Sequence, residues 1–210
     1  MAVAVALALS ATACASEAVQ GPDGGSLADT FRARVDEVPV TEVDPPSSDC
    51  LVIDQQGVDV VVEAGELAPA TFALENVVDR TSTDSAFQRC AFDEEPTRNG
   101  RLVSIAAGLT PLDRDGFEAA LLASEDAVGS FEGEAPGLES SNVFAAGLPG
   151  RWQFAWVADG FFIDVELSFG PENAEILTPE QAELGFRLLS EAVDEVARSV
   201  RDTDDSDDET

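Results

Sequence analysis

Hydrophobic and polar positions alternate most regularly over residues 151–169, on either side of Ala158-Asp159-Gly160. Asp-Gly is a strong signal for a tight turn, so we predict a hairpin with strands at 151–157 and 161–169. Alternation places one set of apolar side chains towards the core. This set comprises Trp152, Phe154, Trp156, Phe161, Ile163, Val165, Leu167 and Phe169. Phe162 falls on the opposite face, where it is either exposed or covered by another helix.

A second hairpin is predicted from the strand-like runs 85–92 and 101–107, which are separated by a polar segment that closes with Asn99-Gly100. Segment 50–63 fits both a valine-rich strand and one face of a helix. We predict a helix there, with Ser48 or Asp49 as its cap.

Two further helices carry clearer start signals. Asp113 is placed to cap a helix over 116–126, whose apolar stripe contains Phe117, Leu121 and Leu122. Thr178-Pro179-Glu180-Gln181 combines a cap residue, proline at the first helical position and glutamine at the third, so a long amphipathic helix is expected from there to about Arg201.

Together these elements predict an α+β fold, with a four-stranded, mainly antiparallel sheet made from two hairpins and helices packed on one face. Residues 49–201 form the globular domain, in which 125–150 is a long Gly-, Ser- and Glu-rich loop. Residues 14–48 are expected to be a flexible tether, with Leu27, Phe31 and Val35 at helical spacing inside it, and residues 202–210 a disordered acidic tail.

The first residues predict the compartment. An apolar stretch over Ala2–Leu9 is followed by small residues and Cys14. This pattern resembles a bacterial lipoprotein signal peptide, which implies that residues 1–13 are removed, that Cys14 is lipidated, and that the membrane is a partner through this anchor at the outer face of the cell membrane. Ala11-Thr12-Ala13 also fits an ordinary cleavage site, so free secretion stays an alternative. The apolar run is far shorter than the roughly 20 residues of a spanning helix.

Cysteine count agrees with export. Without Cys14 an even pair remains, Cys50 and Cys90, in a compartment that permits oxidation. We predict a disulfide between them, which stabilises the fold by about 4 kcal/mol according to chain-entropy arguments; two separate buried thiols are the alternative. No metal site is expected, since two thiolates without histidine are too few for a zinc shell.

Charge excludes one class of partner. The net charge is −31, with 42 acidic against 11 basic residues, so nucleic acid would be repelled. Cations are attracted, and the acidic tail is expected to associate weakly with divalent ions. Adaptation to a salty exterior and nucleotide bias explain the acidity equally well.

The chain offers little catalytic chemistry. It contains no His, Lys or Tyr and no phosphate-binding or nucleophile motif, so we predict that it is not an enzyme and uses no cofactor. Glu132, Glu134 and Glu139 are the carboxylates that a hydrolase would use, although a solvated loop explains them better. Asp113-Arg114-Asp115-Gly116 begins like a calcium loop, but Leu121 stands where a ligand carboxylate is needed.

The order of these parts resembles actinobacterial two-cysteine cell-envelope lipoproteins, a family of unknown function. The residues that carry the resemblance are Cys50, Arg89-Cys90-Ala91-Phe92 and Gly147-Leu148-Pro149-Gly150. We expect a non-catalytic module that binds a small ligand or an envelope component beneath the 125–150 segment. Trp152, Trp156 and Phe162 are the candidate pocket residues, although aromatic residues at strand spacing are more often core. The alternatives are a structural or adhesive surface protein and a carboxylate-dependent hydrolase.

Overall fold

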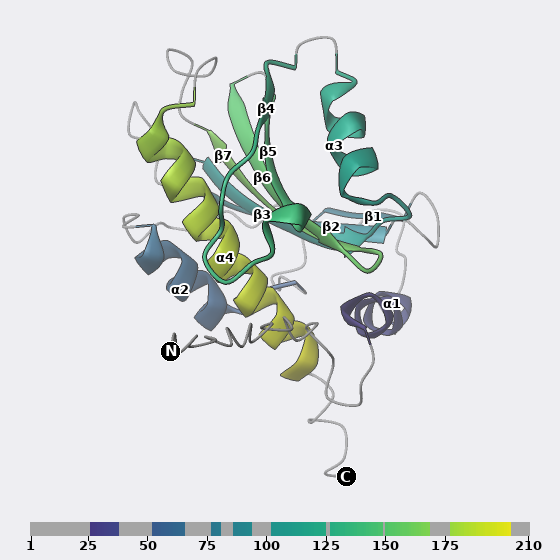
Figure 1. Cartoon of the computed structure of the whole chain (residues 1–210). Coiled ribbons are helices and arrows are strands. Elements are labelled where there is room, and N and C mark those ends of the chain that lie inside the picture. Colours follow the sequence, from purple (N-terminus) through teal and green to yellow (C-terminus); the bar gives the residue numbers. More distant parts are fainter. Residues whose placement is uncertain are drawn as a thin grey trace, which may run out of the picture.

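The computed structural model describes residues 26–37, 52–65, 77–80, 86–93, 102–124, 127–148, 150–168 and 177–202. Its helices and strands, together with one 3-10 turn (η1), follow the chain in this order (Figure 1): α1 (Leu27–Glu37), α2 (Gln55–Ala64), β1 (Val77–Arg80), β2 (Ala86–Asp93), β3 (Leu102–Leu109), α3 (Arg114–Leu122), β4 (Gly129–Phe131), η1 (Ser140–Asn142), β5 (Val143–Leu148), β6 (Arg151–Ala158), β7 (Phe161–Ser168) and α4 (Pro179–Asp202).

The strands form one antiparallel sheet in the order β1-β2-β3-β7-β6-β5-β4. Both predicted hairpins are confirmed, as the pairs β2–β3 and β6–β7. They join through β3 and β7, where Ile105 lies opposite Val165. The α+β class is therefore confirmed, but the sheet has seven described strands instead of four.

Much of the predicted 125–150 loop is regular structure. It contains β4, η1 and the six-residue strand β5. All six residues of β5 are buried. A strand that is buried on both faces carries apolar residues at successive positions, so Val143–Leu148 lacks the alternation by which the other strands were recognised.

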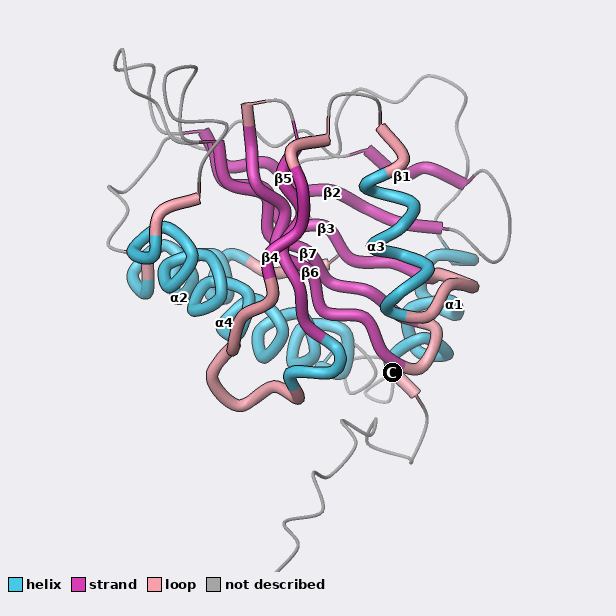
Figure 2. Tube along the Cα trace, turned by 45° about the horizontal axis from the view of Figure 1, so that its top comes forward, coloured by secondary structure: helices cyan, strands magenta, loops and turns pink. Residues whose placement is uncertain are grey.

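Helices cover both faces of the sheet, whereas one covered face was predicted. Figure 2 shows α2 and α4 on one side and α3 on the other. The main core contains all seven described residues of the predicted core-facing set, from Trp152 to Leu167. The opposite face is also apolar near Phe162, which joins Phe144 and Val157 in a second cluster beneath α3. Because both faces of these strands are hydrophobic, each needs a helical cover.

The predicted tether was wrong over its central part, since α1 belongs to the domain. Leu27, Ala28 and Phe31 are buried in the main core, and the Phe31 ring meets Phe161 edge-on at 5.3 Å between centroids. A helix that is marginal alone is stabilised by burying such a face. The described domain therefore starts at Ser26 and not at residue 49.

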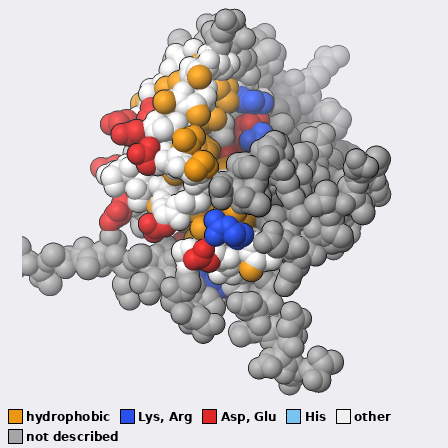
Figure 3. Space-filling view, turned by 90° about the vertical axis from the view of Figure 1, so that its right-hand side faces the viewer, with side chains coloured by type: hydrophobic (Ala, Val, Ile, Leu, Met, Phe, Trp, Pro, Cys, Tyr) orange, Lys and Arg blue, Asp and Glu red, His pale blue; other side chains and the backbone are white. Residues whose placement is uncertain are grey.

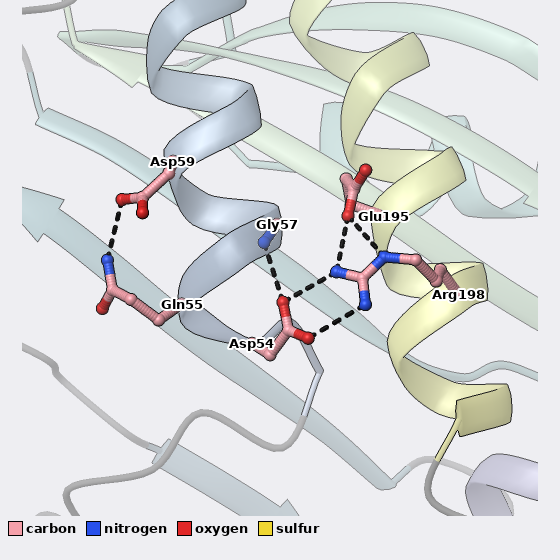
Figure 4. A network of polar contacts seen from close by, with 6 residues as sticks. All are labelled: Asp54, Gln55, Gly57, Asp59, Glu195 and Arg198. Carbon is pink, nitrogen blue, oxygen red and sulfur yellow. Dashed lines mark hydrogen bonds and ion pairs between the residues drawn. The ribbon is translucent and has the colours of Figure 1, made fainter.

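The predicted start signals are confirmed for two helices. Thr178 and Gln181 form a reciprocal capping box, in which the Thr178 N–H donates to Oε1 at 3.0 Å and the Gln181 N–H donates to Oγ1 at 3.3 Å. Asp113 accepts from the Gly116 N–H at 2.8 Å and caps α3, which ends at Leu122. The helix expected over 50–63 is also present, but Asp54 caps it (Figure 4).

Some predictions lie outside the described residues. These are the signal peptide over 1–13, Cys14, Cys50 and the tail from residue 203. Among the helices that are described, none is both long and apolar enough to cross a bilayer.

Candidate functional site

A cleft of about 710 Å³ opens at one end of the sheet, a volume typical of sites for small organic ligands. Three segments line it: residues 110–115 between β3 and α3, residues from 137–142 before β5, and residues 156–160 around the β6–β7 turn. The middle segment belongs to the 125–150 region that was predicted to be a loop.

The lining combines an apolar wall with an excess of acid. Trp156, Leu112, Leu138 and Pro111 contribute hydrophobic surface, and Leu112 is 41% exposed. Four carboxylates stand against one guanidinium, namely Asp113, Asp115, Glu139 and Asp159 against Arg114. The cleft is therefore both apolar and negatively charged.

Arg114 is held by carboxylates on three sides. Its guanidinium lies 2.8 Å from Glu118, 3.0 Å from Asp115 and 3.4 Å from Glu132, and its Cζ is 5.2 Å from the centroid of the Phe144 ring. Burial lowers the pKa of Arg114, but the hydrogen bond to Asp115 and the three negative charges raise it above its ordinary value. This charge is neutralised inside the protein and adds little attraction for an anionic ligand.

The segment that contributes Leu138 and Glu139 is fastened to α4. The Ser190 hydroxyl donates to the Pro136 carbonyl, and Gly133 lies against the ring of Phe186, so closely that a Cβ there would be 2.1 Å from Cε2. Packing on α4 therefore sets the position of one cleft wall.

The β6–β7 turn supplies the second wall. Asp159 and Gly160 have φ of 51° and 78°, as expected for a tight turn between twisted antiparallel strands. The Thr110 N–H donates to the Gly160 carbonyl at 2.9 Å. This hydrogen bond joins the turn to the segment 110–115, which forms the third wall of the cleft. Asp159 is exposed and borders the opening.

The three candidate pocket residues do not meet in one pocket. Trp156 lines the cleft and is 8% exposed, whereas Trp152 belongs to the main core and Phe162 to the second cluster. Phe162 packs on Phe117 of α3 with 4.9 Å between ring centroids. Strand alternation explains the separation, since residues 152 and 156 share a face that residue 162 cannot reach.

The acidic residues of the predicted loop have separate positions. Glu139 borders the cleft, Glu132 pairs with Arg114, and Glu134 is exposed. Asp113, considered as part of a calcium loop, caps α3. In the described part of the chain, no three residues with metal-binding side chains are grouped closely enough to hold an ion.

Sequence reasoning missed Thr110, Asn142 and Asp159 as cleft residues. The Asp-Gly signal was available but was interpreted only as a hairpin turn. Residues 110, 142 and 159 are far apart in the sequence, so no local pattern indicates that they lie close together in the fold.

No family model matches the chain, and no curated protein or solved structure matches it either.

Proposed function

We propose that this protein is an exported, lipid-anchored envelope protein whose domain binds a small ligand without catalysis. The observation that carries the proposal is the 710 Å³ cleft, because it combines concave apolar surface with a few charged groups.

From the charge of the cleft we infer that the ligand is an organic cation. Four lining carboxylates exceed the single guanidinium, and that guanidinium is already paired. The net charge of −31 adds a long-range attraction for positive ligands. Trp156 and Leu112 favour a ligand with an apolar part beside its ammonium or guanidinium group, since aromatic rings and carboxylates both attract such cations.

The location rests on the N-terminal pattern, in which an apolar run leads to Cys14. Lipidation there would hold the domain at the outer face of the cell membrane, as in the two-cysteine lipoproteins that the chain resembles. Labelling cells with a radioactive fatty acid tests this. Label on the wild-type protein and none on Cys14→Ser supports the anchor, whereas label on neither supports free secretion.

The Cys50–Cys90 disulfide stays part of the proposal. Cys90 is fully buried in the same core cluster as Val52, two residues after Cys50, so a short chain separates Cys50 from that cluster. Intact mass before and after reduction tests the pairing. An increase of about 2 Da, together with one linked peptide pair after digestion, supports it. Two free thiols would contradict it.

The first test of binding is native mass spectrometry of the protein released from its own envelope. A discrete extra mass that dissociates on activation supports a binding module. The absence of any such mass would favour a structural or adhesive role.

Variants then place the ligand. Asp159→Asn combined with Glu139→Gln removes two cleft charges and should weaken binding of the released ligand at least tenfold, roughly the effect of losing one charge-assisted contact. Glu134→Gln is the matched control, because Glu134 is exposed on the same segment but does not line the cleft. Equal affinity in all three proteins would exclude the cleft as the site.

A further inference from the structure

Strand β4 forms one end of the sheet and, in the described part of the chain, pairs with a neighbour on one side only. Its partner is β5, where Ser130 lies opposite Ala146, and the strand order ends at β4. Figures 1 and 2 show β4 between α3 and α4. An edge strand presents unpaired backbone N–H and C=O groups along its outer side, so it can accept a further strand.

The residues of β4 do not block this edge. Proteins commonly protect an edge strand with a proline or a charged side chain within it, but β4 consists of Gly129, Ser130 and Phe131. Ser130 and Phe131 are exposed. Because the strand has three residues, backbone pairing alone would be short, and a docked segment would need side-chain contacts as well.

Two exposed apolar side chains can supply such contacts. Val128 directly precedes β4 and Phe131 ends it, and each is 42% exposed. Single apolar residues scattered on a surface need no explanation. These two, however, lie at both ends of one edge strand, where the alternate side chains of an added strand would reach them.

Both side chains continue the main core to the edge of the sheet. The ring of Phe131 is 6.3 Å from that of Phe186, a core residue of α4. A Cβ at position 147, which is Gly147, would be 3.0 Å from Cβ of Val128 and 2.9 Å from Cζ2 of Trp152, so Val128 lies beside a core tryptophan. An apolar side chain that docks here would therefore extend the core on the α4 side.

Exposed carboxylates lie on the other side of this edge. Glu132 directly follows β4 and is 3.4 Å from Arg114 of α3, so it points to the α3 side, opposite to Phe131. Glu132 and Asp115 are 84% and 87% exposed. Together with Glu118 they exceed the single charge of Arg114. An added strand would thus meet apolar surface on one of its faces and negative charge on the other.

The charge decides which kind of partner fits. Figure 3 shows the adjoining side of the molecule, where acidic side chains again border an apolar area. The net charge is −31, so a second copy would be repelled and would bring the same acidic residues to the same edge. A basic segment would be attracted over a long range and would find complementary charge on arrival.

We propose that residues 128–132, here called the docking edge, bind an extended segment of another protein in which apolar and basic residues alternate. Alternation would place the apolar side chains beside Val128 and Phe131 and the basic ones beside Glu132, because successive residues of a strand point to opposite faces. None of these three residues lines the cleft, and the proposal depends neither on the ligand of the cleft nor on the lipid anchor.

Fluorescence anisotropy of a labelled (Arg-Val)4 peptide, titrated with the purified full chain, tests the docking edge. Binding is expected at low ionic strength, where charge attraction is least screened. An (Arg-Pro)4 peptide has the same charge but lacks alternate backbone N–H groups, so it should bind at least tenfold more weakly, the ratio roughly expected for the loss of strand pairing.

Phe131→Ser and Val128→Ser should each weaken binding of (Arg-Val)4 about tenfold, because each removes an apolar contact. Val128→Ser keeps the test valid if loss of the contact with Phe186 prevents Phe131→Ser from folding. Leu112→Ser is the matched control, since Leu112 is 41% exposed but lies in the cleft, and it should leave peptide affinity unchanged. Hydrogen exchange should slow over residues 128–132 when the peptide binds.

Four results would overturn the proposal. The first is no binding of (Arg-Val)4, and the second is equal affinity for (Arg-Pro)4, which would reduce the interaction to charge alone. The third is a loss of binding in Leu112→Ser but not in Val128→Ser, which would place the peptide in the cleft. The fourth is a dimer of the protein alone in sedimentation velocity that Val128→Ser dissociates, which would assign the docking edge to a second copy.

Discussion

Asp54 and Arg198 meet in a two-point contact that joins the start of α2 to the last turns of α4 (Figure 4). Nη1 of Arg198 donates to Oδ2 at 3.0 Å and Nη2 donates to Oδ1 at 2.7 Å. The same Oδ1 accepts from the Gly57 N–H at 2.7 Å, and Glu195 accepts from the guanidinium at 2.7 Å and 2.8 Å. One carboxylate therefore caps one helix and attaches it to another.

Replacing Asp54 should separate these two roles. Asp54→Ala loses both the cap and the ion pair and should lower the free energy of unfolding by about 1–2 kcal/mol. Asp54→Asn keeps a cap acceptor and should cost less, about 0.5 kcal/mol, because the side chain is 47% exposed and the ion pair is screened. Urea denaturation measures both. Asp59→Ala on the exposed side of α2 is the control, and an equal loss in Asp54→Ala and Asp59→Ala would contradict the cap.

The same contact predicts a response to acid. The hydrogen bond from Arg198 lowers the pKa of Asp54 below its ordinary value of 3.8, although partial burial opposes this. A carboxylate with a lowered pKa in the folded state stabilises the fold above that value and loses the effect as pH falls through the folded pKa. The stability difference between wild type and Asp54→Asn should thus be constant above about pH 4 and shrink below it. A difference that grows in acid would contradict the assignment.

Gly185 lies where α4 crosses β6, and its lack of a side chain permits the contact. A Cβ at this position would lie 2.1–2.4 Å from three atoms of the Phe154 ring. Gly185→Ala gains about 1 kcal/mol of helix propensity, yet we expect a net loss of about 2 kcal/mol because overpacking outweighs it. The double variant with Phe154→Leu should recover part of this loss in a denaturation cycle. If the stability losses of the two single variants simply add in the double variant, the clash between residue 185 and the Phe154 ring is excluded.

Burial of Asp164 predicts the opposite pH response to that of Asp54. Burial raises the pKa of Asp164 to about 7; Glu166 adds to the increase, while Arg89, Gln153 and Arg151 oppose it. Between about pH 4 and pH 7 the folded state holds the extra proton, so stability should fall as pH rises, by at most about 1.4 kcal/mol per pH unit. Asp164→Asn should flatten this slope in urea titrations from pH 5 to pH 8. Parallel curves for the two proteins would contradict it.

The Ser190–Pro136 hydrogen bond predicts a link between α4 and the cleft. Ser190→Ala should lower stability by about 1 kcal/mol and increase amide exchange over residues 133–139, since this segment would lose an attachment to the helix. Hydrogen exchange followed by mass spectrometry measures it. Ser130→Ala on the exposed position of β4 is the control, and unchanged exchange over 133–139 in Ser190→Ala would show that the bond does not hold the wall.

The sequence predicted correctly those turns and helix starts that are determined by a few neighbouring residues. The Asp159-Gly160 turn and the Thr178–Gln181 box act within four residues, so both appeared where expected. β5 could not be recognised in this way, because its burial depends on α3 and the second cluster on one face of the sheet and on the main core on the other. The cleft likewise depends on three distant segments. Of its residues, Trp156, Glu139 and Asp113-Arg114-Asp115 were considered as potential site residues beforehand, but nothing in the sequence indicated that they share one cleft.

The packing of α1 shortens the distance that a membrane anchor can span. Only about twelve residues separate Cys14 from Ser26, which directly precedes α1, and such a chain reaches at most about 40 Å even when fully extended. Ser26 and Leu27 share a small cavity with Trp156 and Asp159, both of which also line the cleft. With Cys14 lipidated, the mouth of the cleft would therefore stay within a short tether of the bilayer surface, and its ligand would have to be available in the layer next to the membrane.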